Sequence, residues 1–273
     1  MITFNPYAPR LCKLVEVKTE TPTIKTFVLE MPEPFHFRAG QFIELTLPGA
    51  GEAPFTPSSS PLEHDRLETT VIRTGSMTDR LHEVEPGAWL GVRGPFGKGY
   101  PIEKYRGKEI LVVGGGCGLA PLRSLIYQLL SESYRYRRIS IKYGAREPDE
   151  LLYRDSYATW TAERPNVDFT CTVDAGAPGW TGRVGLVTTL LSGLDLSLPD
   201  TVAFVCGPEV MLKFVTLTLL KEGLSAEQIY LSMNRRMSCG IGQCGRCSIG
   251  PYYLCKDGPD MNYAAIQQYE NVF

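Results

Sequence analysis

The sequence lacks the features that mark several common classes of protein. It contains no basic block and no basic amphipathic stretch, and its formal net charge of −2 argues against nucleic acid as a partner. The longest apolar runs are far shorter than a membrane span, and the first residues lack the charged and apolar regions of a signal peptide. We therefore expect a soluble, cytoplasmic protein, large enough at 273 residues for two domains and a small appendage.

Histidine is also scarce. The three histidines, His36, His64 and His82, form no triad and no metal-binding pattern. The adjacent carboxylates of Asp149 and Glu150 are typical of a solvated loop or a helix cap. The sequence therefore predicts no acid–base catalytic constellation.

Cysteine occurs in two different arrangements. Half of the cysteines are scattered singly, as is typical of reduced thiols in a cytosolic protein: Cys12, Cys117, Cys171 and Cys206. The other half lie close together, with the spacing C-x4-C-x2-C-x7-C: Cys239, Cys244, Cys247 and Cys255.

The spacing of this second group indicates a [2Fe–2S] cluster as its ligand. The first three cysteines have the plant-type ferredoxin spacing, but the fourth follows much sooner than in ferredoxins. Interspersed glycines at 240, 242, 245 and 250 let the backbone turn tightly around a cluster. A zinc site usually shows two C-x2-C pairs, where this chain has one, so a non-enzymatic zinc-stabilised adaptor is the alternative interpretation.

The order of the expected elements predicts a β plus α/β fold in three parts. Short β-rich runs between turns, over about residues 10–100, predict a small antiparallel β-barrel with one helix at 78–84. From about residue 108, alternating strands and helices predict a doubly wound parallel sheet. Its expected strands are 109–113, 139–143, 168–173, 201–206 and 228–231, and its expected helices are 119–130, 151–161, 184–191 and 209–222. The predicted domains are 1–103, 104–231 and 232–273, and the last is expected to need its metal to fold.

A glycine-rich turn follows the first expected strand of the α/β part. In the run Gly114-Gly-Gly-Cys-Gly118, backbone N–H groups can approach a pyrophosphate at the start of the next helix, although any tight strand–helix turn can use such glycines. Leu119 occupies the final glycine position of G-x-G-x-x-G. The runs Tyr143–Arg146 and Cys206–Pro208 end two other strands at the same edge, which favours nucleotide binding there.

The end of the third expected strand bears on the choice of nucleotide. Asp174 favours a free ribose hydroxyl, and hence NAD(H), over a 2′-phosphate. Arg146 and Arg183 leave NADP(H) open as the alternative.

Two polar segments of the barrel suggest a second phosphate-bearing ligand. Residues 53–60, APFTPSSS, offer hydroxyls and an aromatic ring. Arg73 followed by residues 75–78 offers a guanidinium and the start of a helix. Taken alone, both segments are equally typical of ordinary polar loops.

Together these motifs resemble the ferredoxin–NADP⁺ reductase superfamily. The resemblance is carried, in order, by Pro54-Phe-Thr-x-Ser58, Arg73-x-Gly-x-x-Thr78, Gly114–Pro121 and Cys206-Gly-Pro208. The C-terminal cysteines make the chain similar to one branch of the superfamily. That branch holds the gamma subunits of cytoplasmic hydrogenases and sulfhydrogenases, a subunit of anaerobic sulfite reductase, and the electron-transfer subunit of dihydroorotate dehydrogenase.

The resemblance implies FAD, or alternatively FMN, bound by the barrel. Matching positions place the isoalloxazine ring and ribityl chain beside Pro54, Phe55, Thr56 and Ser58. They place ribose and pyrophosphate against Ile72, Arg73, Gly75, Met77 and Thr78. They place the nicotinamide nucleotide along Gly115, Cys117 and Gly118, with Cys206 near the point of hydride transfer. Ala53 and Pro57 depart from the family pattern, in which Arg and a β-branched residue are usual.

The implied activity is that of an NAD(P)H-dependent flavin and iron–sulfur oxidoreductase of diaphorase type. NAD(P)H would deliver a hydride to the flavin, and electrons would then pass singly through the cluster to a partner redox subunit of a hydrogenase- or sulfite-reductase-type complex. Electron flow in the reverse direction is equally consistent with the sequence. The alternative is a stand-alone NAD(P)H reductase for a soluble carrier or an oxygenase.

Overall fold

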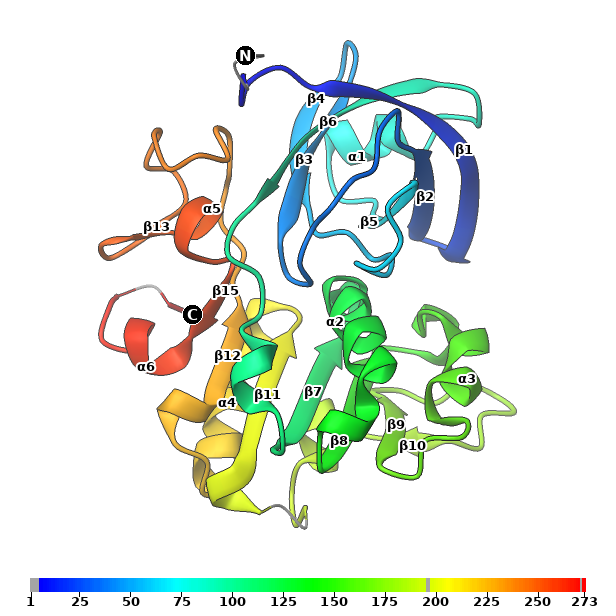
Figure 1. Ribbon diagram of the computed structural model, residues 1–273. Coiled ribbons are helices and arrows are strands. Elements are labelled where there is room, and N and C mark those ends of the chain that lie inside the picture. Colours follow the sequence, from blue (N-terminus) through cyan, green and yellow to red (C-terminus); the bar gives the residue numbers. More distant parts are fainter. Residues whose placement is uncertain (1–4, 195–196, 271) are drawn as a thin grey trace.

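The computed structural model describes residues 5–194, 197–270 and 272–273, which form three units (Figure 1). An antiparallel β unit lies at the top of the view and an α/β unit lies below it. A small C-terminal module lies beside both. No helix among the described residues is long and apolar enough to cross a membrane.

The first unit is a six-stranded antiparallel sheet with the order β4-β3-β6-β1-β2-β5. Its strands are β1 (Arg10–Thr21), β2 (Ile24–Glu30), β3 (Phe42–Leu47), β4 (Gly51–Phe55), β5 (Arg66–Ile72) and β6 (Trp89–Phe96). An isolated bridge between Pro57 and Thr69 connects the segment after β4 to β5, so the two edges of the sheet meet. Apolar side chains such as Leu14, Phe27 and Leu45 fill the interior. The predicted barrel is confirmed, and β4 is the strand that the sequence pattern did not single out.

The second unit is a seven-stranded sheet with the order β10-β9-β8-β7-β11-β12-β15. Its strands are β7 (Glu109–Gly115), β8 (Arg138–Ala145), β9 (Val167–Val173), β10 (Arg183–Val184), β11 (Thr201–Cys206), β12 (Ile229–Ser232) and β15 (Asp260–Asn262). All neighbouring pairs are parallel except β12 and β15. The chain runs outward from β7 in both directions, which is the doubly wound topology that the sequence predicts.

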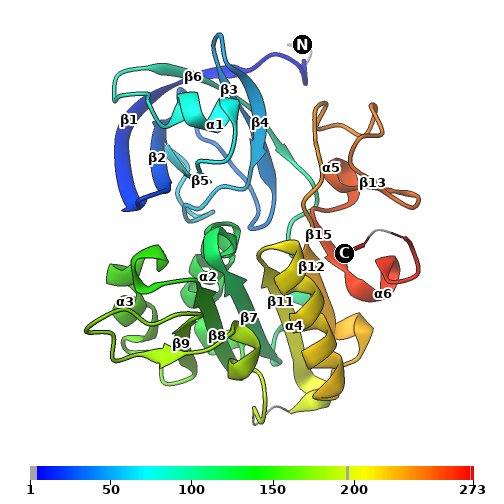
Figure 2. The same ribbon diagram turned by 180° about the vertical axis from the view of Figure 1, so that it is seen from behind.

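Helices cover both faces of this sheet. Figure 1 shows α2 (Leu119–Ser131) in front of the sheet, and the view from behind in Figure 2 shows α4 (Glu209–Lys221) on the other face. Alternate residues of β7 explain this arrangement, because successive side chains of a strand point to opposite faces. Ile110 and Val112 belong to the core with α2, and Leu111 and Val113 belong to the core with α4.

Two expected helices of this unit are wrong in extent or type. The one expected at 151–161 is only α3 (Tyr157–Thr161), because Tyr153 adopts a left-handed conformation at φ 55° that interrupts a helix. The one expected at 184–191 is a short strand, β10, followed by a 3-10 turn at Val187–Leu190. Gly185, at φ 142°, lies between them and is not helical. The helix expected at 78–84 begins and ends earlier, as α1 (Ser76–Leu81).

The C-terminal module is small and shares its core with the α/β unit. It contains the hairpin β13 (Ser248–Ile249) and β14 (Tyr252–Tyr253), then α5 (Leu254–Asp257), β15 and α6 (Tyr263–Ile266). Its buried side chains belong to the same apolar cluster as those of α4. The predicted domain boundaries stay predictions, but β15 shows that the last segment of the chain completes the sheet of the second unit.

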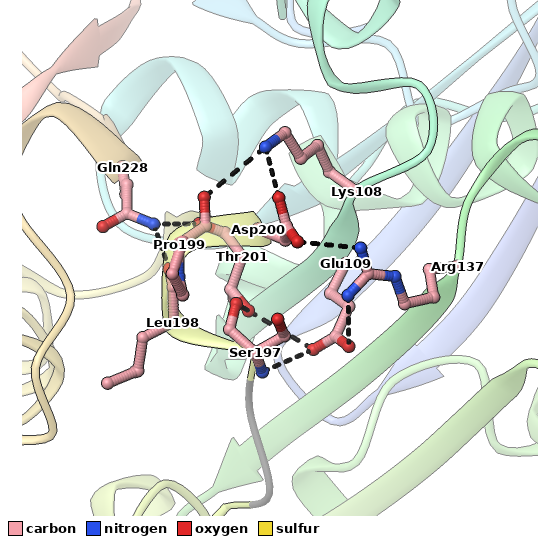
Figure 3. Close-up of polar contacts among 9 residues, drawn as sticks. All are labelled: Lys108, Glu109, Arg137, Ser197, Leu198, Pro199, Asp200, Thr201 and Gln228. Atoms are coloured by element: carbon pink, nitrogen blue, oxygen red, sulfur yellow. Dashed lines mark hydrogen bonds and ion pairs between the residues drawn. The ribbon is translucent and has the colours of Figure 1, made fainter.

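A polar network closes the amino-terminal edge of the α/β sheet (Figure 3). Asp200 accepts hydrogen bonds from Lys108 and Arg137, and these two bonds lower the pKa of its carboxyl to about 2. Glu109 accepts a hydrogen bond from the Thr201 hydroxyl at 3.3 Å. The network joins the starts of β7 and β11 to the residue that precedes β8, at the edge opposite the glycine-rich turn.

Candidate functional site

The glycine-rich turn packs closely onto the end of a neighbouring strand. Residues Gly116–Gly118 form a 3-10 turn between β7 and α2. A Cβ atom on Gly118 would lie 2.4 Å from the Cys206 carbonyl oxygen, and one on Gly115 would lie 2.0 Å from the Met211 sulfur. Real Cβ atoms do not approach other atoms so closely, so glycine is required at Gly118, where the contact is with backbone, whereas at Gly115 the Met211 side chain would have to move.

This contact lies at the topological switch point of the sheet. β7 is followed in the sheet by β8 on one side and by β11 on the other. In open α/β sheets ligands bind at such a point, outside the carboxyl ends of the strands. The structure therefore brings Gly115, Gly118 and Cys206 together where a nucleotide is expected.

Cys117 connects this turn to the barrel. Burial raises the pKa of its thiol to about 11, and a hydrogen bond with the Ile72 backbone opposes that shift. A residue predicted to contact flavin and one predicted to contact NAD therefore lie against each other. Burial also raises the pKa of the Cys206 thiol to about 12. Both thiols are protonated at neutral pH, so neither supplies a thiolate nucleophile.

The predicted flavin residues after β3 fall into two groups. Residues 54–56 are half-buried and remain accessible to a ligand. Ser58 is 0% exposed, and its hydroxyl pairs with that of Thr70 at 2.9 Å. The Tyr153 hydroxyl donates to the same Thr70 oxygen at 2.6 Å, so this network connects the barrel to the α/β unit. A contact between the Ser58 side chain and flavin stays a prediction.

The segment after β5 forms the tight turn that begins α1. The Thr78 hydroxyl accepts hydrogen bonds from the N–H groups of residues 74–75 at 2.9 and 3.0 Å. The half-exposed Arg73 guanidinium pairs with Asp79 at 2.9 Å, and Met77 packs partly against the barrel core. Of the predicted pyrophosphate contacts, Arg73 is therefore the exposed charged group, whereas the Thr78 hydroxyl is used by the turn itself.

Asp174 lies at the same edge as the glycine-rich turn but farther along the sheet. It follows β9, and β8 separates β9 from β7. Its N–H donates to the Ala145 carbonyl at 2.9 Å, and the N–H of Ala175 donates to the carbonyl of Arg146 at 2.9 Å. Asp174 and Arg146 are both exposed, and their backbone segments are hydrogen-bonded to each other. Both side chains are therefore available to a nucleotide, and the structure is compatible with NAD(H) and with NADP(H).

The cysteine loop is shaped by glycine and by contact with the barrel. Gly240 and Gly242 have φ values of 74° and 76°, in the left-handed region that favours glycine. A Cβ atom on Gly240 would lie 2.7 Å from the Phe96 ring, so the loop lies directly against the last residue of β6. These left-handed φ values agree with the prediction that the glycines let the backbone turn tightly around the cysteine sulfurs.

The sulfur atoms of the loop are surrounded by backbone donors. The Gly242 N–H donates to the Cys255 sulfur at 3.1 Å, and the Gln243 N–H donates to the Cys239 sulfur at 3.4 Å. Burial alone would raise the pKa of the Cys239 thiol, but backbone N–H groups, including that of Gln243, lower it to about 6. Cys239, Cys247 and Cys255 are buried, and Cys244 is exposed. Thiolates that accept N–H donors in an enclosed loop suit an iron–sulfur cluster.

The four sulfurs interact with one another. Cys239 interacts with Cys244, and Cys255 interacts with both Cys247 and Cys239. Among the described residues, no group of three or more His, Cys, Asp or Glu side chains is arranged to hold a single metal ion. Four thiols with the spacing C-x4-C-x2-C-x7-C suit a two-iron cluster, in which each iron takes two of four cysteines. The four predicted ligands thus lie in one loop whose chemistry fits the cluster.

Two buried charged groups near these sites were missed by sequence reasoning. Arg93, in β6, donates to the Cys239 carbonyl at 3.3 Å. Asp260 is 8% exposed and lies at the carboxyl-terminal edge opposite Ser232, close to Cys206. Arg93 and Asp260 each lie in a strand that contributes to a buried core. The neighbouring sequence contains no spacing pattern that would distinguish either residue from an ordinary charged residue at the surface.

Three family profiles together match nearly all of this architecture. An oxidoreductase FAD-binding domain matches residues 11–100, and an oxidoreductase NAD-binding domain matches residues 112–216. The iron–sulfur cluster binding domain of dihydroorotate dehydrogenase B matches residues 234–267. These matches define the class of the protein: it is a flavin-, NAD- and iron–sulfur-binding oxidoreductase. The predicted binding of FAD, NAD and an iron–sulfur cluster is confirmed.

Curated relatives identify the family within this class. Sulfhydrogenase 2 subunit gamma of Pyrococcus furiosus is 34% identical over 95% of this chain and 96% of its own length. A probable dihydroorotate dehydrogenase B (NAD(+)) electron transfer subunit of Methanocaldococcus jannaschii is 34% identical over 92% of this chain and 88% of its own length. The chain belongs to the family of these sulfhydrogenase gamma and dihydroorotate dehydrogenase B electron-transfer subunits. The predicted resemblance is confirmed.

Solved structures show the same fold. A chain of an NADH-dependent reduced ferredoxin–NADP oxidoreductase aligns over 98% of this chain and 94% of its own, with a TM-score of 0.74 and 24% identity. A cytochrome P450 reductase from Amycolatopsis aligns over 82% of this chain and 70% of its own, with a TM-score of 0.73 and 24% identity. The second similarity covers less of this chain than the first.

Proposed function

We propose that this chain is the electron-transfer subunit of a larger redox complex. NADH is the nucleotide substrate, FAD and a [2Fe–2S] cluster are the resident groups, and a hydrogenase- or sulfite-reductase-type subunit is the partner. The observation that carries the proposal is that the four-cysteine loop packs directly on the barrel through Gly240 and Phe96, so the flavin unit and the cluster unit are adjacent. The relatives named as gamma and electron-transfer subunits support the same role.

The protein's own groups bind and orient, and no side chain is needed as an acid or base. Gly115 and Gly118 let backbone N–H groups approach a pyrophosphate, and Arg73 supplies a charge to the flavin phosphates. Cys206, as a neutral thiol at the switch point, would lie beside the nicotinamide of a bound nucleotide. FAD and the cluster, when bound, supply the conversion of a two-electron hydride into single electrons.

The four cysteines Cys239, Cys244, Cys247 and Cys255 hold the cluster. Cys244 is the exposed member of the set, so electrons leave the chain toward a partner that covers this part of the loop. None of the eight cysteines, all of which lie among the described residues, forms a disulfide, which supports a reducing compartment, and we place the protein in the cytoplasm.

Anaerobic purification of the full chain tests the proposal. We expect equimolar FAD, two irons and two acid-labile sulfides per chain, and bleaching of both absorbance bands by NADH more readily than by NADPH. Zinc in a colourless protein would contradict it, and selective bleaching by NADPH would overturn the nucleotide assignment alone. Affinity purification from the native source then identifies the partner. A chain that purifies alone, and reduces a soluble carrier at full rate, would favour the stand-alone reductase.

A further inference from the structure

A single buried guanidinium joins the flavin barrel to the cluster loop. Arg93 lies in β6 and its residue is 5% exposed. Its Nη1 donates to the carbonyl of Pro6 at 2.8 Å and to the carbonyl of Cys239, the first cluster ligand, at 3.3 Å. Its guanidinium also lies over the ring of Phe96, 5.5 Å from the centroid. One side chain of the barrel therefore holds both the N-terminal segment and the start of the cysteine loop.

Two carboxylates accompany this cation. Glu52, in β4, binds Arg93 through both of its oxygens, and the Nε contact measures 2.8 Å. Glu44, in β3, is 1% exposed, and its Oε1 has no hydrogen-bond partner among the described residues. Burial, followed by the Glu52 charge, raises the pKa of Glu44 to about 7, although Arg93 opposes both. Arg93 is thus a buried positive charge that adjoins a cluster ligand and lies beside one buried and one partly exposed carboxylate.

The sign of the resulting electrostatic effect follows from the chemistry of the cluster. When one electron leaves the reduced flavin and enters the cluster, no protein bond forms or breaks, and the cluster becomes one unit more negative. A fixed positive charge nearby stabilises that added negative charge, and a fixed negative charge destabilises it. Because Arg93 and Glu52 are held in partly dry surroundings, solvent and salt screen these effects less than at a surface.

We propose that Arg93 is a positioning residue for electron transfer, which holds the Cys239 end of the cluster loop on the barrel and raises the reduction potential of the cluster. Glu52 sets the orientation of the guanidinium and lowers the same potential. Hydrogen bonds and charges just outside the ligands of a metal centre commonly tune it in this way. The proposal rests on the proposed function, because it requires a redox-active cluster at these cysteines.

The test is a redox titration of the full chain, with the cluster followed by electron paramagnetic resonance and the flavin by absorbance. Arg93→Met is expected to shift the one-electron equilibrium of the cluster about tenfold toward the oxidised form. This shift corresponds to a reduction potential about 59 mV lower than that of wild type. Arg93→Lys keeps the charge and is expected to stay near the wild-type value. Glu52→Gln removes a negative charge and is expected to shift the cluster in the opposite direction. The flavin potential serves as an internal reference, since Arg93 contacts a cluster ligand directly.

Arg123→Met is the matched control. Arg123 is also a partly buried arginine, paired with Glu68 at 2.6 Å and placed over the Tyr153 ring, but it belongs to α2 and reaches the barrel at β5. We expect it to lower thermal stability without moving the cluster potential.

The outcomes separate charge from simple loosening of the structure. The proposal is overturned if Arg93→Met keeps its cluster at the wild-type potential, or if Glu52→Gln shifts the potential in the same direction as Arg93→Met. Should Arg93→Met fail to retain a cluster, Glu52→Gln decides alone, and an unchanged potential in that variant contradicts the proposal. Wild-type protein that contains no FAD or no cluster contradicts the proposed function instead.

Discussion

Replacing Asp260 with asparagine is expected to stabilise the protein at neutral and alkaline pH. Among the described residues, neither carboxylate oxygen of Asp260 has a hydrogen-bond partner. A Cβ atom on Gly40 would lie 2.1 Å from Oδ2, so the carboxyl group is packed directly against backbone. A charged carboxylate at this position has lost its water, and the nearby hydroxyls of Ser232 and Tyr100 compensate for that loss only in part.

The magnitude follows from the pKa of the group in the two states. Burial raises the pKa of the Asp260 carboxyl to about 7, while the nearby hydroxyls of Ser232 and Tyr100 oppose the shift. In the unfolded chain the pKa is about 3.9. Because the folded value is the higher one, the folded protein binds this proton more tightly. The corresponding stability is present below about pH 4 and is lost as the pH rises through about 7, and the loss reaches about 4 kcal/mol.

The assay is thermal unfolding of wild type and Asp260→Asn between pH 5 and 8.5. Between pH 5 and 8.5 the wild type loses about 2.7 kcal/mol of this stability, so at about 2–4 °C per kcal/mol the variant should gain about 5–11 °C relative to wild type between the two ends of the range. Asp200→Asn is the control, because Asp200 is a paired carboxylate whose pKa is lowered, and it should show no such gain. If the amide itself changes the melting temperature by the same amount at every pH, this constant difference does not affect the test. The test compares how the melting temperatures of variant and wild type change with pH. Parallel pH profiles for wild type and Asp260→Asn would refute the reasoning.

Three further predictions concern the cluster loop and the far edge of the sheet. Cys255→Ser should lose most acid-labile sulfide and cluster absorbance but retain FAD; equal loss of FAD would contradict separate sites. Gly240→Ala should destabilise the protein by about 1–3 kcal/mol, since φ is 74° and the new methyl group would meet Phe96 at 2.7 Å. Its control is Gly245→Ala, which has the same φ of 74° with no atom within 4 Å of the new methyl group, so an equal loss of thermal stability would show that the ring contact contributes nothing. Asp200→Asn should flatten the acid unfolding profile between about pH 4 and 2, because the folded pKa of about 2 lies below the unfolded value near 3.9 and this stability is lost as the pH falls; an unchanged acid profile would contradict this.

Much of the fold is local in origin and could be read from the sequence. The glycine-rich turn between β7 and α2 follows from a buried strand, glycines and a helical period, all within neighbouring residues. The helix expected at 151–161 was wrong because Leu151 and Leu152 are buried by the tertiary core and Tyr153 takes a left-handed conformation, so packing overrides the helical pattern.

The functional sites also contain features that local sequence predicts and features that depend on tertiary packing. Spacing alone predicts the four cysteines as ligands, because a loop that encloses a cluster must bring its ligands together over a short stretch of chain. Ser58 shows the limit of matching by position, since its hydroxyl is fully buried and pairs with Thr70, a contact between segments that no local motif reveals.

The sequence by itself predicted the order of barrel, α/β sheet and cysteine-rich tail and the candidate ligands of the cluster, because each depends on residue types at short, regular separations. The class of oxidoreductase came from the resemblance of its motifs to a known family. Only the tertiary structure decided what surrounds those sites. Arg93 and Cys239 are 146 positions apart, and Asp260 reaches the switch point because β15 pairs with β12. Burial and electrostatic contact depend on distance in space, so the charges that act on the redox centres become visible only after the chain has folded.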